Sequence, residues 1–248
     1  MKRALLLITC IIALLLSFTL TSCDDESLYA PNGLEYKIND DGETCTIIGI
    51  GKCTDTVVHI PEQIKKYKVT AIGEEAFCAP RNQESALCEN ITEFILPNGL
   101  TTIEKSAFFG CKALTSIVIP DTVLTIEACA FQECTALTSI TLSESLTSIS
   151  TQICAGCTSL QSIVIPASVK MIEESAFLQS GLLQVTLGSE TEEIKDFAFH
   201  SDIASPTFYY SGTTVQWKSI TFGSSFVFDF ENSFVKCSDS NFPISLID

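Results

Sequence analysis

The sequence predicts an elongated α/β solenoid in which short repeats stack and share one continuous core. Three observations predict it: a motif recurring at a nearly constant period, a short alternating apolar run after each copy, and Phe and Cys at fixed places in the period. Each repeat is too short to bury its own apolar face, so neighbouring repeats must stack. A hydrophobic content of 46% in 248 residues is ample for such a core.

Residues 1–22 have the order of a bacterial export signal. Lys2 and Arg3 precede an apolar run over residues 4–16, and small residues lead up to Cys23. The run is shorter than the roughly 20 apolar residues that a transmembrane helix needs. The tetrapeptide at residues 20–23, Leu-Thr-Ser-Cys, resembles the lipoprotein box, in which the chain is cut before the cysteine and lipid is attached to it. We therefore predict lipidation of Cys23, with an ordinary secretory signal as the alternative.

Residues 23–33 are expected to form an acidic linker. Asp24, Asp25 and Glu26 follow the expected lipid site, and this run resembles the surface-export signal of lipoproteins from Bacteroidota. A solvated linker would have the same composition. The resemblance implies a surface-exposed lipoprotein in the outer membrane of a Gram-negative bacterium.

Residues 71–205 contain about six repeat units of 22 to 23 residues. The motif Ile-x-x-x-Ala-Phe, with one degenerate copy, starts at Ile72, Ile103, Ile126, Ile149, Ile172 and Ile194. The steps are 31, 23, 23, 23 and 22 residues, and the first contains an insertion of eight residues at 79–86. An alternating run such as Ile-Val-Ile at residues 117–119 follows each motif and predicts a strand with one buried face.

Residues one period apart lie above one another in a stack, so the sequence predicts core columns. One column consists of Phe77, Phe108, Phe131, Phe177 and Phe199, with Cys154 replacing Phe in the fourth unit. Burial of each ring contributes about 1.5–3 kcal/mol to the stability of the fold. A second column comprises Cys88, Cys111, Cys134 and Cys157, followed by Ser180. We predict buried thiols here, because in-register columns suit disulfide torsions poorly.

The cysteine spacing does not favour a metal site. The Cys-x-x-Cys pair at Cys154 and Cys157 is explained by the two columns, and zinc requires further close ligands. The remaining cysteines are bridged or free in an extracytoplasmic chain; they are Cys45, Cys53, Cys78, Cys129 and Cys237.

The period and the pattern Leu-x-x-Ile-x-Ile fall in the range of leucine-rich repeats. Residues 34–239 resemble the BspA-like bacterial repeats, whose units read Leu-Thr-Ser-Ile-Val-Ile-Pro and then Ile-Glu-x-x-Ala-Phe-x-x-Cys. The resemblance implies a right-handed coil with a parallel sheet on its concave face, a β-hairpin cap within residues 34–70 and a β-rich cap over residues 206–248. It also implies adhesion to host or partner-cell proteins.

Alternation within each strand run also predicts which residues point outward. One outward column is Ile95, Val118, Thr141, Val164 and Thr186, and the other is Glu93, Ser116, Ser139, Ser162 and Gln184. A protein partner could bury such an apolar, β-branched stripe, so we predict the ligand site there. Strand propensity alone is the alternative explanation. Other places for a ligand are the insertion near Arg81 and the aromatic C-terminal segment around Trp217.

The sequence offers little support for catalysis. His59 and His200 are the two histidines, and we expect both to be structural, since neither has a nucleophile or carboxylate at a recognisable spacing. Glu104, Glu127 and Glu173 recur once per unit and are interpreted as a solvated column. We therefore expect no enzymatic activity and no cofactor.

A net charge of −16 disfavours nucleic acid and anionic lipid as direct partners. We expect a monomer that binds an extracellular protein or glycan and touches the membrane only through its lipid. An accessory lipoprotein of a glycan-processing system and a structural spacer are the alternatives. The tripeptide Asp-Thr-Val at residues 55–57 and 121–123 resembles an O-glycosylation site of Bacteroidota, or occurs by chance.

Overall fold

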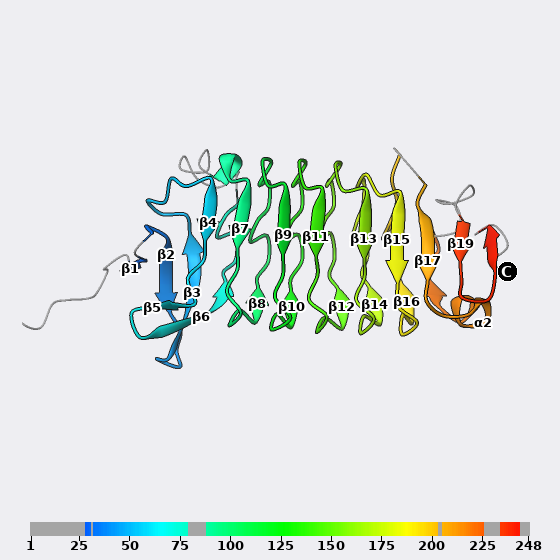
Figure 1. Ribbon diagram of the computed structural model, residues 1–248, viewed down its shortest axis with the longest axis horizontal. Helices are drawn as coiled ribbons and strands as arrows, with labels where there is room; N and C mark the ends of the chain where they lie inside the picture. Colours follow the sequence, from blue (N-terminus) through cyan, green and yellow to red (C-terminus); the bar gives the residue numbers. More distant parts are fainter. Residues whose placement is uncertain (1–27, 31, 79–87, 203–204, 226–233, 244–248) are drawn as a thin grey trace, which may run out of the picture.

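The computed structural model describes residues 28–30, 32–78, 88–202, 205–225 and 234–243. It is a β-solenoid in which coils follow one another in a row, with the N-terminal hairpins at one end and the C-terminal segment at the other (Figure 1). The predicted stack of repeats is confirmed. Cys23, the insertion at residues 79–86 and Arg81 lie outside the described residues.

Each coil contributes a strand to the first ladder, which runs along the upper side of Figure 1. Its strands pair in parallel and in register, with residues one period apart opposite each other, as at Ser116 and Ser139. One sheet holds β4 (Val57–His59), β7 (Glu93–Ile95), β9 (Ser116–Val118) and β11 (Ser139–Thr141). A second sheet continues with β13 (Ser162–Val164), β15 (Gln184–Leu187), β17 (Thr207–Tyr210) and β19 (Phe234–Lys236).

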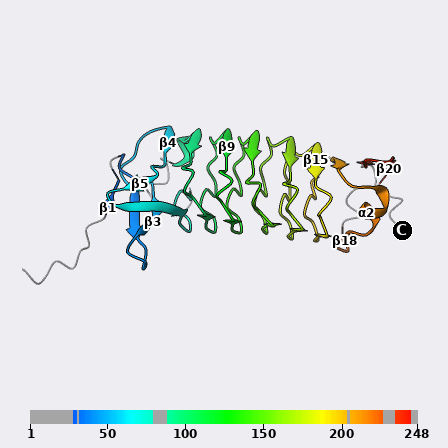
Figure 2. The same ribbon diagram turned by 60° about the horizontal axis from the view of Figure 1, so that its bottom comes forward.

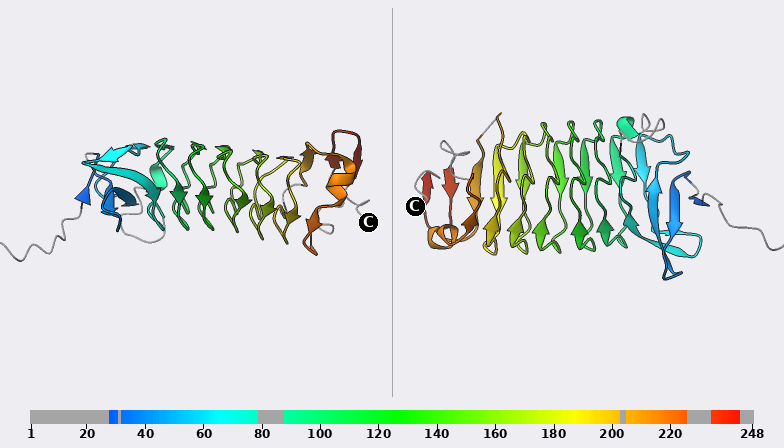
Figure 3. Two further views of the ribbon diagram at one scale, coloured as in Figure 1. Left: turned by 90° about the horizontal axis from the view of Figure 1, so that it is seen from below. Right: turned by 180° about the vertical axis from the view of Figure 1, so that it is seen from behind.

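A second ladder of short parallel strands lies along the lower side of Figure 1, and the repeat strands in it end at the Ile that opens each motif. It comprises β6 (Tyr67–Ile72), β8 (Thr102–Ile103) and β10 (Thr125–Ile126), then β12 (Ser148–Ile149), β14 (Met171–Ile172), β16 (Glu193–Ile194) and β18 (Thr221–Phe222). The views in Figures 2 and 3 show the coils in a nearly straight row. The handedness and the concave curvature stay predictions.

The α/β class is a wrong prediction. In the part of the chain that the structure describes, helix is limited to η1 (Cys88–Asn90) and α2 (Thr214–Lys218). The Ala-Phe segments are turns instead, because the residue before each described copy has a left-handed backbone, which a right-handed helix cannot contain. The φ angles are 57° at Glu75, 55° at Ser106, 62° at Cys129, 54° at Gln152, 57° at Ser175 and 57° at Phe197.

Both ladders are interrupted between the same two coils, because β11 and β13 belong to different sheets, as do β10 and β12. Side-chain hydroxyls bridge this junction: buried Ser143 donates to the Val123 carbonyl at 2.7 Å, and Ser150 donates to the Ile126 carbonyl. The turns remain bonded across it, with the Phe131 amide donating to the Ile153 carbonyl at 2.8 Å. The solenoid therefore consists of two blocks joined through turns and hydroxyls.

The predicted phenylalanine column is confirmed as buried. Its rings stack nearly parallel, with centroids 5.1 Å apart at Phe108 and Phe131 and 5.3 Å apart at Phe177 and Phe199. At the degenerate copy Cys154 is buried, and the preceding residue is Ile153, which stands where the other repeat units have Ala. The larger Ile thus occupies the space that the smaller Cys leaves.

The predicted burial of the cysteine column is also confirmed, and the ten cysteines in the described residues are free. Three thiols donate to the carbonyl of a Phe in the preceding coil, at 3.4 Å for Cys111, 3.2 Å for Cys134 and 3.1 Å for Cys157. Burial raises the pKa of the Cys111 and Cys134 thiols well above the usual value of 9.0. Cys45 and Cys53 are buried free thiols as well.

Hairpins lie at the N-terminal end of the row. They involve β1 (Leu28–Tyr29), β2 (Glu35–Ile38), β3 (Thr44–Gly49) and β5 (Gln63–Ile64). β2 pairs antiparallel with β1 and β3, and β3 joins the second ladder by pairing parallel with β6. The hairpin therefore covers the open end of that ladder, whose core would otherwise meet water.

The C-terminal end of the row consists of β17, α2, β18, β19 and β20 (Asn241–Pro243), which pairs antiparallel with β19. Helix α2 begins with a capping box between Thr213 and Gln216. It places Trp217 inside, fully buried against Phe208 and Tyr210. Trp217 itself is therefore closed to a ligand, while the segment around it as a ligand site stays an untested alternative.

Candidate functional site

The candidate site is the outer face of the first ladder. In each of its three-residue strands the middle residue is buried and the two flanking side chains point out, as in β13, where Ile163 lies between Ser162 and Val164. The parallel register then aligns flanking residues from coil to coil, as at Glu93 and Ser116 or Val164 and Thr186. We call this surface the strand face.

All ten residues of the two predicted columns lie on the strand face. Ile95, Val118 and Val164 expose 41%, 64% and 62% of their surface, which makes them exposed apolar residues. Thr141, Thr186, Glu93, Ser139, Ser162 and Gln184 are also exposed, and Ser116 is half-buried. A shallow hollow of about 270 Å³ over β7 and β9 includes Ile95, Val118 and Pro120 in its lining. The interruption between β11 and β13 divides the face into two parts.

The strand face extends beyond the predicted columns at both ends. His59 pairs with Ile95 and is exposed, so it belongs to the strand face. At the other end Tyr209 pairs with Thr186 and Lys236 pairs with Tyr209. Tyr209 lies one period of 23 residues after Thr186, a signal in the sequence that could have found it.

Lys236 and Tyr209 form a local contact at the C-terminal end of the strand face. The Lys236 ammonium lies 4.9 Å from the centroid of the Tyr209 ring and 3.4 Å from its hydroxyl oxygen. These two residues, Thr186, Ser211 and Ser238 are among those that line an open hollow of about 320 Å³. The combination of cation, aromatic ring and hydroxyls can bind an anionic group next to an apolar one.

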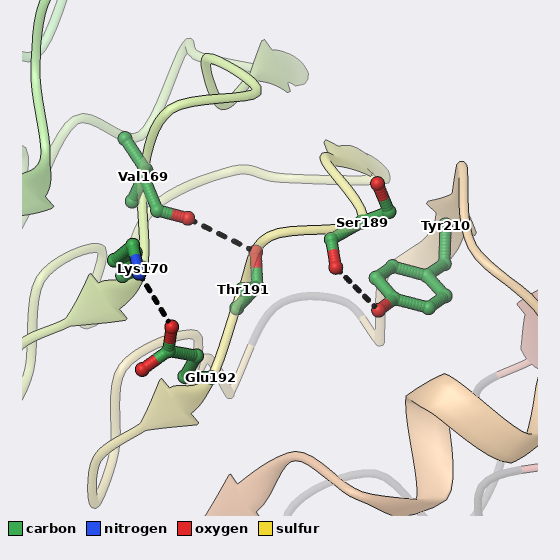
Figure 4. A network of polar contacts seen from close by, with 6 residues as sticks. All are labelled: Val169, Lys170, Ser189, Thr191, Glu192 and Tyr210. Atoms are coloured by element: carbon green, nitrogen blue, oxygen red, sulfur yellow. Dashed lines mark hydrogen bonds and ion pairs between the residues drawn. The ribbon is translucent and has the colours of Figure 1, made fainter.

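A third hollow, of about 470 Å³, is polar and lies where the last coil meets the C-terminal segment. It is lined by Ser189, Glu190, Thr191, Glu192, Tyr210, Gln216, Ser219 and Thr221. Figure 4 shows its wall: the Tyr210 hydroxyl donates to the Ser189 carbonyl at 3.2 Å, and Lys170 pairs with Glu192 at 2.7 Å. Its hydroxyl, amide and carboxylate groups can hydrogen-bond a polar ligand.

The recurrent glutamates bind neighbouring coils rather than each other. Glu104 accepts from the Glu74 amide and Glu127 accepts from the Lys105 amide, each at 2.9 Å. Glu173 pairs with Lys195 at 2.7 Å. Each carboxylate therefore contacts the neighbouring coil. Glu127 is exposed, as the predicted solvated column requires, whereas Glu104 and Glu173 are half-buried.

Few other side chains are arranged for chemistry. His200 lies 3.6 Å from Asp202, and the Thr122 hydroxyl of one Asp-Thr-Val tripeptide donates to the Leu100 carbonyl at 2.7 Å. In the described ranges, no three side chains of His, Cys, Asp or Glu are grouped as a metal site. A search for helices that could span a membrane finds none in those ranges.

A family model described as the BspA-type leucine-rich repeat region matches residues 71–205 in six copies. The chain belongs to this family. Two solved structures share the fold with 25% identity. One is a leucine-rich repeat protein from T. pallidum, with a TM-score of 0.67, covering 79% of this chain and 86% of the other. The second, from Eubacterium ventriosum, has a TM-score of 0.62 and covers 82% of this chain, which spans 50% of that protein's chain. No curated protein sequence matches this BspA-type chain.

Proposed function

We propose that this BspA-type protein is a surface lipoprotein of a Gram-negative bacterium, not an enzyme, and that it binds a partner protein through the strand face and thereby mediates adhesion. The observation that carries the proposal is the line of exposed β-branched residues, with Val118 and Val164 each more than 60% exposed. Apolar side chains exposed on one face are costly to leave in water and are stabilised when a partner covers them.

The chemistry of the strip favours a protein partner. Between its ends the face is uncharged, although the chain has a net charge of −16. The core of a protein interface is depleted of charged side chains in the same way. Strand propensity explains why β-branched residues occur in these strands, but it does not require them on the exposed side.

The test uses the mature chain with Cys23→Ala, passed over immobilised extracellular-matrix proteins in a surface plasmon resonance assay. Val118→Glu combined with Val164→Glu should abolish binding, because two carboxylates would be buried without partners. Leu124→Glu is the matched control, since Leu124 is 61% exposed beside the second ladder. If the folded double variant binds as well as the wild type, the strand face is not the site.

Anchoring and exposure need separate tests, because Cys23 lies outside the described residues. Radiolabelled palmitate should enter the wild type and not Cys23→Ala, and label in the variant would contradict the lipid site. A protease added to intact cells should cleave the protein. Cleavage only after lysis would place it inside the outer membrane.

A second candidate function is glycan binding, favoured by the polar hollow of about 470 Å³ beside Tyr210. Hydroxyl, amide and carboxylate groups are those that hydrogen-bond sugar hydroxyls. On a glycan array the wild type should then bind a neutral oligosaccharide that Glu190→Gln with Thr221→Ala no longer binds. An array without signal would eliminate this candidate.

A further inference from the structure

The C-terminal end of the strand face differs in composition from the rest. Tyr209 follows the column of Thr186, and β19 adds Phe234 and Lys236, which are two residues apart and so point to the same side. Phe234 exposes 52% of its surface, so an apolar ring is accessible at this end of the strand face. Aromatic side chains are enriched in protein interfaces, and Tyr often supplies much of the binding energy there.

The cation at this end is oriented before any partner arrives. The Lys236 ammonium is held 4.9 Å from the Tyr209 ring centroid, and within the described part of the chain no carboxylate pairs with it. A lysine side chain normally loses much rotamer freedom on binding, and the ring contact removes part of that loss in advance. Lys236 can therefore still pair with a carboxylate from outside.

Charge along the face is asymmetric. Among the described outward residues of the first ladder, Glu93 is the acidic residue and Lys236 the basic one. β7 and β19 are separated by four intervening strands of repeats and β17, which at about 4.8 Å per strand is roughly 30 Å. A partner that covers the whole face therefore meets a negative charge at one end and a positive charge at the other.

We propose that Phe234, Tyr209 and Lys236 anchor an acidic side chain and an adjacent apolar side chain of the partner protein. The carboxylate pairs with the Lys236 ammonium, and the apolar side chain covers Phe234. This anchor sets the direction in which the partner lies, with its acidic end on the C-terminal segment. The inference rests on the proposed binding by the strand face and names the chemistry of the partner there.

The probe is a phage-displayed library of random peptides, selected on the mature chain carrying Cys23→Ala. Recovered peptides should be enriched in Asp or Glu beside an aromatic or aliphatic residue. One acidic peptide and its Gln or Asn analogue are then synthesised, and their Kd values are measured by fluorescence anisotropy. The acidic peptide should bind at least about tenfold more tightly than its analogue.

Variants of the protein locate the carboxylate. Lys236→Gln should weaken binding of the acidic peptide at least about tenfold and leave the affinity for its neutral analogue unchanged. The difference measures the coupling between Lys236 and the carboxylate of the peptide. Lys236→Arg should retain binding, and Phe234→Ser should weaken both peptides. Lys37→Glu is the charge control, since Lys37 is exposed on β2 at the opposite end. Trp217 fluorescence confirms that each variant is folded.

The outcomes separate the two proposals. A pool without acidic enrichment, or an acidic peptide that binds Lys236→Gln as it binds the wild type, overturns the anchor. If Val118→Glu with Val164→Glu abolishes adhesion to matrix protein while Lys236→Gln leaves it unchanged, the face binds but this anchor does not contribute. If the double variant adheres as the wild type does, the proposed function itself fails.

Discussion

At Ile153 and Cys154 the usual order of a small residue followed by a large one is reversed. The other units of the repeat region place a small Ala before a large Phe, whereas here a large Ile precedes a small Cys, and both are buried. Protein interiors are close-packed, so a change in volume at one position must be matched nearby. The degenerate copy therefore preserves the core rather than leaving a cavity.

This exchange predicts strong coupling between the two residues. Cys154→Phe alone should destabilise the protein by about 1–3 kcal/mol through overpacking, and Ile153→Ala alone by about 2–5 kcal/mol through a cavity. The double variant restores the pattern of the other units, so it should lose less free energy of unfolding than the two single variants together. Urea denaturation of all four proteins measures this cycle, and simple additivity would contradict it.

The buried thiols also make a prediction about reactivity. Burial raises the pKa of Cys111 and Cys134, so their reactive thiolate forms are scarce near neutral pH. Iodoacetamide at pH 8 should label the half-buried Cys129 and Cys237 first and reach Cys111 and Cys134 only in denaturant. Mass spectrometry of the labelled peptides measures this order. Equal labelling of the four in the native protein would show that the column is accessible.

Among the elements, α2 is held by a carboxylate from the far side of the C-terminal segment. Asp239 accepts from the Thr214 amide at 2.9 Å and from its hydroxyl at 2.8 Å, and these bonds lower the pKa of Asp239 from the usual 3.8. A lowered carboxyl pKa stabilises the fold above the pKa of the unfolded chain and loses that effect as pH falls through the folded value.

Acid should therefore loosen α2 first. After correction for intrinsic rates, the amides of residues 214–218 should exchange faster with deuterium at pH 3 than at pH 6. Asp239→Asn should reproduce part of this increase at pH 6, and Asp40→Asn, an exposed carboxylate on the β2–β3 turn, serves as the control. Unchanged exchange in Asp239→Asn would mean that the carboxylate does not hold the helix.

As a whole molecule, the solenoid is two blocks that meet where both ladders are interrupted, between β11 and β13 and between β10 and β12. Stability in such stacks depends on each coil and on its contact with the next. A junction bonded through turns and hydroxyls such as Ser143 should couple the blocks less tightly than a continuous ladder does.

The single Trp makes this testable, because Trp217 lies in the C-terminal block. In a urea titration its fluorescence should report that block, while far-UV circular dichroism reports both. We expect the two transition midpoints to differ, because a weakly coupled junction lets each block unfold according to its own stability. Coincident midpoints would indicate one cooperative unit if the slope of the unfolding free energy against urea concentration also matched the surface exposed by the whole chain.

The sequence by itself determined the period, the phenylalanine and cysteine columns, and which residues of the strand face point outward. Those features follow from local spacing, because residues one period apart must stack when no unit can bury its own core. The outward side of a strand follows from alternation alone. The family resemblance rested on the same periodic residues.

Only the tertiary structure decided between helix and turn in the Ala-Phe segments, where residues such as Ser106 and Gln152 adopt a left-handed backbone despite having side chains. It also decided that the ladders break between β11 and β13 and between β10 and β12, and that β19 brings Lys236 next to Tyr209. These outcomes depend on bonds between coils and on pairing outside the repeat period. Local composition carries no signal for such contacts, because they are set by how the neighbouring coil lies.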